Sequence, residues 1–217
     1  QDLKGQSMIV TAGPTVESID PVRYLTNRSS GKMGYSIARE AIARGADVTL
    51  ISGPTNLSIP QNLKKFVQIE SAQDLSEAVV SNLSENKIVI QSAAVADYKP
   101  KTYSDKKIKK KNDDLSIELS RNYDIAYEIG KIKEEMILIG FAAETNDLIE
   151  HAKGKIKKKN LDFIVANDLT KEGAGFRADT NIVKIIDVEG NITEYPKMKK
   201  EEVANVILDK VKALLEK

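Results

Sequence analysis

The sequence contains no cysteine and a single histidine. Without cysteine, the chain can form no disulfide, no thiolate metal site and no thiol nucleophile. The histidine, His151, lies in a charged segment with a helical pattern, so we interpret it as a surface residue rather than a catalytic base. Any chemistry must therefore use lysine, arginine, asparagine, serine, carboxylates, backbone amides or a bound metal ion.

The chain also lacks a long apolar run. None approaches the roughly 18 residues needed to span a bilayer, and the N-terminus has no apolar region of a signal peptide. The formal net charge is only +1 over 217 residues, so the chain as a whole is not a polyelectrolyte. We therefore expect a cytoplasmic protein with no nucleic-acid partner and no membrane partner.

Its composition, 41% hydrophobic and 30% charged, suits one globular α/β domain spanning residues 1–217. Short β-branched segments alternate with helical patterns, which is typical of a parallel sheet covered by helices. We predict a Rossmann-like, mostly parallel sheet with a C-terminal antiparallel hairpin and a basic flap loop. The expected strands are 7–13, 46–54, 64–70, 87–98, 136–145 and 161–169, the hairpin is 180–196, and the helices are 31–45, 72–86 (with Ser71 as N-cap), 123–135, 146–160 and 199–217.

Three connections, residues 12–30, 93–120 and 167–180, are too long for simple turns. Long ordered loops in compact domains are usually functional or mobile. All three follow the carboxyl ends of expected strands, where open α/β sheets bind their ligands. We therefore expect the functional site at this edge of the sheet.

The first connection ends in "NRSSGKMG", residues 27–34, immediately before an expected helix. Its serines, its backbone N–H groups and the positive end of the helix dipole favour an anion. The segment matches neither a Walker A loop, which would need a glycine at Thr26 and a hydroxyl residue at Met33, nor a complete Rossmann fingerprint. The alternative is an ordinary crossover with serine capping, in which Lys32 is a solvated first-turn lysine.

The second connection joins a run of small residues, Ser92–Ala94, to the basic segment 106–111, "KKIKKK". The small residues let the backbone approach a ligand closely. Asp97 can accept hydrogen bonds from ribose hydroxyls or help to hold Mg²⁺. The basic segment is either a solvated charge run or a flap over a polyphosphate, since lysine binds phosphate as a point charge.

A third group of candidates follows the expected strand 136–145. Phe141 can pack against a base or a ribose, or it can belong to the core. Lys155 and Lys159 are spaced i, i+4 and therefore share one helix face. Two cations beside an aromatic ring form a plausible triphosphate contact.

Taken together, these motifs resemble those of the phosphopantothenoylcysteine synthetases. The segments occur in the family's order: "TAGPT", "IDPVRYLTNRSSGKMG", "SAAVADY", "KIKK", "GFAAET", "KKKNLDFIVAND" and "GAGF". The family is often the C-terminal half of a bifunctional coenzyme A biosynthesis flavoprotein, and we expect no decarboxylase domain in this chain. The resemblance implies ligation of 4′-phosphopantothenate to L-cysteine, in which CTP and Mg²⁺ form an acyl-cytidylate, pyrophosphate is released and cysteine displaces CMP.

The resemblance also implies roles for particular residues. Asn27 corresponds to the asparagine associated with the acyl-cytidylate, Arg23 to a neighbouring arginine of that motif, and Lys107 to the lysine of the first half-reaction. The magnesium ligands are unassigned beyond the nucleotide phosphates, with Asp97 as one candidate. The implied nucleotide-binding residues are Gly13, Ser29, Ser30, Ala93, Ala96, Asp97, Tyr123, Asp124, Ile125, Ala126, Phe141, Lys155 and Lys159.

Two residues depart from the family pattern. Pro14 replaces a glycine, so its turn must accommodate a fixed φ and a missing N–H, and Tyr123 replaces a proline. Members of the family commonly form homodimers in which the partner partly covers each active site, and residues 181–195 are a candidate contact. ATP-dependent members share the ligation chemistry, so the choice of CTP follows from the resemblance alone.

Two other functions are compatible with parts of the sequence. A nicotinamide-dependent oxidoreductase would need a complete G-x-G-x-x-G and an acid after the second strand, where "LISGP" stands instead. An RNA-binding module could use the lysine runs, but aromatic residues for base stacking are few.

Overall fold

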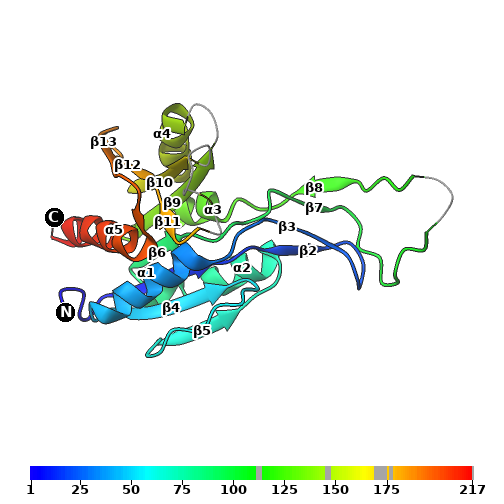
Figure 1. Ribbon diagram of the computed structural model, residues 1–217, viewed down its shortest axis with the longest axis horizontal. Helices are drawn as coiled ribbons and strands as arrows, with labels where there is room; N and C mark the ends of the chain where they lie inside the picture. Colours follow the sequence, from blue (N-terminus) through cyan, green and yellow to red (C-terminus); the bar gives the residue numbers. More distant parts are fainter. Residues whose placement is uncertain (111–113, 145–147, 169–174, 176–177, 217) are drawn as a thin grey trace.

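An eight-stranded sheet forms the centre of the computed structural model, which describes residues 1–110, 114–144, 148–168, 175 and 178–216 (Figure 1). The strand order is β13-β12-β10-β9-β6-β1-β4-β5. Six of these strands are parallel, and β12 and β13, the last two of the sheet in the sequence, are added at one edge by antiparallel pairing. The bounds are β1 Ser7–Ala12, β4 Asp47–Ser52, β5 Lys65–Gln68, β6 Ile88–Gln91, β9 Ile137–Glu144, β10 Phe163–Asp168, β12 Val183–Asp187 and β13 Ile192–Glu194.

The six parallel strands follow the Rossmann order. The sheet starts at β1, proceeds through β4 to β5, returns to the other side of β1 with β6, and continues through β9 to β10. The topological switch point therefore lies between β1 and β6, and ligands bind at such points in open α/β sheets. The predicted fold class, including the C-terminal antiparallel hairpin, is confirmed.

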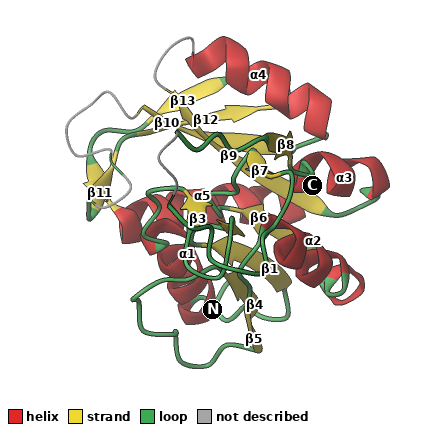
Figure 2. Cartoon of the chain, turned by 90° about the vertical axis from the view of Figure 1, so that its right-hand side faces the viewer, coloured by secondary structure: helices red, strands yellow, loops and turns green. Residues whose placement is uncertain are grey.

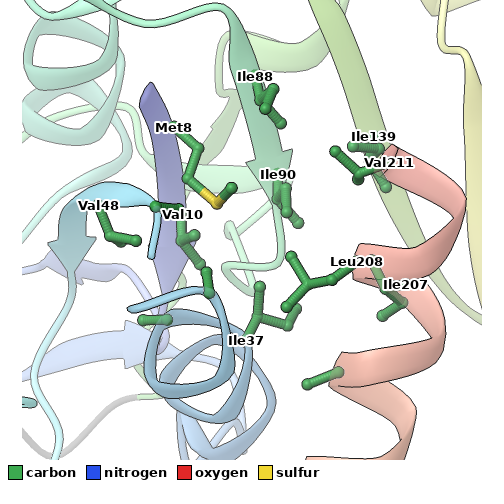
Figure 3. Packing of buried hydrophobic residues seen from close by; sticks show 14 of the residues in the cluster. Met8, Val10, Ile37, Val48, Ile88, Ile90, Ile139, Ile207, Leu208 and Val211 are labelled. Atoms are coloured by element: carbon green, nitrogen blue, oxygen red, sulfur yellow. The ribbon is translucent and has the colours of Figure 1, made fainter. Parts of the chain in front are cut away.

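Helices cover both faces of the sheet, and Figure 2 shows α1 and α5 on one side with α2 and α3 on the other. Successive residues of a strand point to opposite faces, so Met8 and Val10 pack with α1 and α5, whereas Ile9 packs with the helices of the other face. In the first cluster, Val10, Ile37 and Leu208 approach one another between the sheet and the two helices (Figure 3). The bounds are α1 Lys32–Ala43, α2 Ala72–Val80, α3 Ile125–Ile132, α4 Leu148–Lys159 and α5 Lys200–Leu215.

The ends of α2 illustrate how far local signals determine a helix. Ser71 caps its start as predicted: the hydroxyl accepts the N–H of Asp74 at 3.1 Å, and the Asp74 carboxylate accepts the N–H of Ser71 at 2.8 Å. The predicted end at residue 86 is wrong, because α2 stops at Val80 and a short 3₁₀ helix, η1 Leu83–Glu85, follows. The side chain of Asn82 donates to the carbonyl of Ala78 at 2.7 Å, and such bonds compete with helix continuation.

Two antiparallel ribbons project from the body to one side (Figure 1). The first pairs β2 Val16–Ser18 with β3 Tyr24–Thr26, and the second pairs β7 Tyr98–Pro100 with β8 Leu119–Arg121. The sequence predicted loops here, so these strands are a correction. A third small pair joins β11 Thr180–Asn181 to β14 Met198–Lys199. Across the part of the chain that the structure describes, no helix is long and apolar enough to cross a membrane.

Candidate functional site

A cavity of about 1050 Å³ lies at the carboxyl ends of β6, β9 and β10, beside the N-terminus of α1. Three loop segments line it, residues 27–34, 91–98 and 121–126, together with the ends of β9 and β10. This is the edge of the sheet at which the three long connections were predicted to meet. The volume reaches the upper end of the range for small-molecule sites, roughly 300–1,000 Å³, so it is large enough for more than one small ligand.

The start of α1 forms one wall of the cavity. Its N-cap is Gly31, whose φ of 78° lies in the left-handed region and which brings no side chain to cap the first turn. Gly34 lies so close to β1 that an added Cβ would be 2.6 Å from the Cβ of Ala12 and 2.8 Å from the carbonyl oxygen of Thr11. The first helical turn is thereby held directly against the end of β1, and residues 31–34 line the cavity where an anion was predicted.

The loop after β6 is held in place by two buried threonines. The hydroxyl of Thr11 accepts the N–H of Ala93 at 3.1 Å, and the hydroxyl of Thr15 accepts the N–H of Ala96 at 2.9 Å. The N–H of Ala94 also donates to the carbonyl of Gly13 at 2.9 Å. Neither threonine was predicted as a site residue, although their position on either side of the "AGP" turn was a usable signal.

Two asparagines hold the same loop from its other side. The amide nitrogen of Asn27 donates to the carbonyl of Ala94 at 3.0 Å, and that of Asn122 donates to the carbonyl of Ala96 at 2.9 Å. Asp97 follows directly, with an exposed carboxylate at the cavity. The backbone groups of Ala93, Ala94 and Ala96 thus anchor the loop, and the exposed Asn27 and Asp97 line the cavity beside it.

The opposite wall is built by α3 and α4. Asp124 caps α3 by accepting the N–H of Tyr127 at 3.2 Å, and it forms an ion pair of 2.9 Å with Lys159. The ammonium of Lys158 lies 5.9 Å from the ring centre of Tyr127, within cation–π range. Lys155 lines the same wall, so the predicted lysine face of the helix 146–160 does reach the cavity.

A third group of polar residues lies where α1 meets α5. The ammonium of Lys32 is 2.6 Å from the carboxylate of Asp179, and this hydrogen bond lowers the pKa of Asp179. Lys200, the first residue of α5, is almost fully buried and also lines the cavity. Burial lowers the pKa of Lys200, and the nearby positive charge of Lys32 lowers it further.

Positive charge dominates the cavity as a whole. The acidic side chains among its described lining residues are Asp97 and Asp124, and Asp124 is already paired with a lysine. Because the net charge of the chain is only +1, the cations are concentrated at this site, which favours an anionic ligand. The cationic lining residues are Arg28, Lys32, Arg121, Lys155, Lys158, Lys159 and Lys200.

Most of the predicted site residues line this one cavity, and three are not among its described lining residues: Gly13, Arg23 and Lys107. Gly13 is buried beneath the loop that it helps to hold. The predicted residues that do line it are Asn27, Ser29, Ser30, Ala93, Ala96, Asp97, Tyr123, Asp124, Ile125, Ala126, Phe141, Lys155 and Lys159. The motif at 173–176, apart from Gly175, and Lys111 lie outside the described residues.

Arg23 and Lys107 lie on the ribbons instead. The guanidinium of Arg23 donates to the carboxylate of Asp20 at 2.6 Å and to the carbonyl of Ile108 at 2.7 Å. Lys107 is exposed in the connection between β7 and β8. In this chain, therefore, the arginine joins the two ribbons to each other, and the lysine lies at that junction rather than at the cavity.

The structure places both residues that depart from the family pattern next to the cavity or its loops. Pro14 forms an isolated bridge with Ala94 and so takes part in holding the loop after β6. Gly53 passes so close that an added Cβ would lie 1.8 Å from the carbonyl oxygen of Pro14. Tyr123 is exposed at the rim of the cavity.

Within the described ranges there is no group of three or more His, Cys, Asp or Glu side chains that could hold a metal ion. A metal cage built entirely from protein side chains is therefore not seen in that part of the chain. Asp97 remains as an exposed carboxylate at the cavity. This donor set fits an ion such as Mg²⁺, which is often held by one or two carboxylates plus substrate phosphates.

Comparison with known proteins identifies the family. Residues 3–215 match the model of the DNA/pantothenate metabolism flavoprotein C-terminal domain. The chain is 50% identical over 212 residues to the coenzyme A biosynthesis bifunctional protein CoaBC of Bacillus subtilis strain 168, covering 98% of this chain and 52% of that protein. It thus spans about half the length of the curated relatives it matches.

Solved structures agree with this assignment. The crystal structure of the C-terminal domain of a coenzyme A biosynthesis bifunctional protein CoaBC superposes with a TM-score of 0.85 at 44% identity, covering 99% of this chain and 98% of that one. A mutant of Cab2 in complex with phosphopantothenate-cysteine gives a TM-score of 0.79 at 13% identity, covering 97% of this chain and 88% of that one. At that identity the second similarity shows the fold alone.

Proposed function

The chain belongs to the family of the DNA/pantothenate metabolism flavoprotein C-terminal domain, and we propose that it ligates 4′-phosphopantothenate to L-cysteine with CTP, in the cytoplasm, as a step of coenzyme A biosynthesis. The observation that carries the proposal is that one cationic cavity gathers thirteen of the sixteen residues predicted from the resemblance. Its relatives named for coenzyme A biosynthesis support the pathway. The Cab2 complex with phosphopantothenate-cysteine has the same fold.

The proposed reaction has two steps. In the first, a carboxylate oxygen of 4′-phosphopantothenate attacks the α-phosphorus of CTP, the bond to the bridging oxygen breaks, and pyrophosphate leaves with that electron pair. In the second, the amine of L-cysteine attacks the acyl carbon, CMP leaves, and the amine loses a proton. Neither step needs a nucleophile from the protein, which agrees with a chain that has no cysteine and one histidine.

The chain's own contribution is positioning and charge stabilisation. The lysines of α4 and the N-terminus of α1 lie on opposite walls of the cavity, so phosphates bound between them are held in a fixed orientation. Fixed cations and N–H groups stabilise charge that builds up on phosphoryl oxygens. Mg²⁺, when bound through the nucleotide phosphates, would neutralise part of the triphosphate charge, and Asp97 is a candidate ligand for it.

The direct test is pyrophosphate release from the purified chain with Mg²⁺, 4′-phosphopantothenate and L-cysteine, run in parallel with CTP and with ATP. Release that needs CTP and 4′-phosphopantothenate is the expected result. Release with ATP but not with CTP would support the proposed ligation and refute CTP as its nucleotide. No release with either nucleotide would refute the proposed function.

A homodimer is part of the proposal. Large apolar side chains are exposed on the two ribbons, including Val22 at 58%, Tyr24 at 57% and Leu119 at 49%. Exposed apolar surface of this kind is typical of a protein interface. Lys107 is exposed on the same ribbons, and we propose that in such a dimer the Lys107 of one copy serves the cavity of the other.

A further inference from the structure

Lys200 occupies an unfavourable place for a lysine. It is the first residue of α5, where the helix dipole disfavours a positive charge. Only 4% of the residue is exposed, and burial of an ammonium is costly unless partners compensate for it. Its ammonium donates to the carbonyl of Ala178 and, at 3.5 Å, to that of Gly175.

The contacts to the carbonyls of Ala178 and Gly175 do not by themselves require a cation at this position. An uncharged side chain at the first position of α5 would carry no burial penalty for a cation. The residue also lines the cavity, so a lysine there holds a positive charge at the cavity wall. An anionic ligand would compensate for both costs.

Lys200 is close to a second cation at the same end of the cavity. Lys32, the first residue of α1, is near enough to influence it electrostatically, and both interact with Asp179. The side chain of Asp179 is 87% exposed, so solvent weakens its compensation of the two lysines. The start of α1, with its glycine N-cap, adds N–H groups at the same place.

Asn181 supplies an independent indication of a ligand. It is 4% exposed and lines the cavity, yet its Oδ1 has no hydrogen-bond partner within the described part of the chain. Its Nδ2 makes only a weak contact, 3.9 Å from the sulfur of Met33. A buried amide bound this weakly can turn to present its NH₂ group to an anion, since the two orientations fill the same space.

We propose that Lys200, Lys32 and Asn181, with the N-terminus of α1, form a phosphate-binding subsite at the α5 end of the cavity, separate from the lysines of α4. The subsite rests on the proposed function for the identity of its phosphate. Two sources share this chemistry: the β- and γ-phosphates of the nucleotide, and the 4′-phosphate of phosphopantothenate.

The test compares Lys200→Met with the wild-type protein by calorimetric titration. Methionine keeps most of the volume and removes the charge. Two ligand pairs differ only in phosphates: CTP against CMP, and 4′-phosphopantothenate against pantothenate. In one of the two pairs, we expect Lys200→Met to weaken binding of the more phosphorylated ligand by about tenfold or more. The affinity for the less phosphorylated ligand of that pair should stay within about twofold of the wild-type value.

The matched control is Lys197→Met, which removes the same charge from an exposed position three residues away. It should leave all four affinities within about twofold of wild type. If Lys200→Met loses affinity only for CTP, the subsite binds the nucleotide phosphates. If it loses affinity only for 4′-phosphopantothenate, the subsite binds the 4′-phosphate of that substrate. Unchanged affinities for both in a folded Lys200→Met protein would overturn the proposal.

Two further experiments cover a variant that does not fold and a wild-type protein that binds neither ligand. If Lys200→Met does not fold, Lys32→Met replaces it, because that lysine is partly exposed and pairs with an exposed carboxylate; unchanged affinities then overturn the subsite. If the wild-type protein binds neither CTP nor 4′-phosphopantothenate, the proposed function fails. The subsite is then judged by titration of inorganic pyrophosphate into wild type and variant, where equal affinities overturn it.

Discussion

At the scale of single residues, Asn27 connects the first loop to the loop after β6. Its amide donates to the carbonyl of Ala94 at 3.0 Å while the side chain stays exposed at the cavity. We predict that Asn27→Ala slows the conversion of acyl-cytidylate to product by about 10²-fold, the usual effect of losing one fixed hydrogen-bond donor at a reacting centre. Single-turnover consumption of the intermediate measures this directly.

The matched control is Asn122→Ala, because Asn122 makes the same type of bond to the carbonyl of Ala96. Asn122→Ala should disturb the position of the loop but should not slow the conversion of acyl-cytidylate to product as much as Asn27→Ala does. An equal slowing of that step in both variants would indicate that Asn27 acts only by holding the loop. Unchanged consumption of the intermediate in Asn27→Ala would contradict its assignment altogether.

Asp20 ties the two ribbons together and makes that junction sensitive to pH. Burial alone would raise its pKa, but hydrogen bonds from the backbone N–H of Ile108 and Val22 and from Arg23 outweigh burial and lower it below the ordinary 3.8. Because the pKa of Asp20 is lowered in the fold, its ionised carboxylate stabilises the folded state above pH 3.8, and this stabilisation is lost as the pH falls below 3.8.

We therefore predict that Asp20→Asn lowers the melting temperature at neutral pH, and that its difference from wild type narrows as the pH falls below about 4. The measurement is thermal unfolding of both proteins from pH 7 to pH 3. Two curves that stay parallel over this range would show that the Asp20 carboxylate does not contribute to the acid sensitivity.

At the scale of elements, the contact between α1 and β1 depends on Gly34. An added Cβ would lie 2.6 Å from the Cβ of Ala12, closer than side-chain atoms approach, so the start of the helix must move. We predict that Gly34→Ala destabilises the fold by about 1–3 kcal/mol, as overpacking usually does, and also weakens nucleotide binding. Denaturant unfolding and nucleotide titration measure the two effects.

Gly154 provides the matched control, since it lies inside α4 and no described atom is within 4 Å of its added Cβ. Gly154→Ala should be neutral or stabilise by up to about 1 kcal/mol, because alanine favours a helix over glycine. If Gly34→Ala were equally harmless, the close approach of α1 to β1 would not be required for the fold or the site.

The elements also show what the sequence could predict. Ile88–Gln91 and the other central strands are β-branched, buried on both faces and separated by helical periods, so local pattern alone identifies them. The ribbon strands, such as Tyr24–Thr26, are three residues long and exist through pairing and contacts with each other. No local pattern encodes such pairing, and a loop was predicted there.

The same distinction holds for the candidate site. Residues in the connections that follow strand ends, such as Ala93 after β6, were predicted because parallel strands bring their carboxyl ends to one edge. Lys200 was not predicted, since it reaches the cavity only through the packing of the last helix against α1. Its sequence context, a lysine before an amphipathic helix, is that of many surface residues.

At the scale of the whole molecule, the two ribbons are two-stranded and lie outside the central sheet. Two-stranded ribbons are marginally stable by themselves in water. Both ribbons project from the body (Figure 1), and they carry exposed apolar side chains. The hairpin at 181–195 exposes Val188 and Ile192 as well, but one of its strands already pairs with the central sheet. The ribbons are therefore the stronger candidate for contact with a second copy.

A ribbon-mediated homodimer makes a prediction about where Lys107 acts. The lysine is exposed on the ribbon, outside the described lining of its own cavity. In a twofold-symmetric dimer, the lysine of one copy would then serve the cavity of the other. We predict that Lys107→Ala and Asn27→Ala are each nearly inactive in pyrophosphate release or product formation, but that the two chains restore activity when co-expressed.

In the mixed dimer, one of the two sites combines an intact Asn27 with an intact Lys107 from the other copy, so random pairing should recover about one quarter of the wild-type rate. The control co-expresses Lys107→Ala with a chain that carries both substitutions, where no site is intact. If the first mixture is no more active than this control while dimers form, Lys107 acts within its own chain. The ribbon must then close over the cavity of its own chain for catalysis, and the function of Lys107 would not depend on dimer formation.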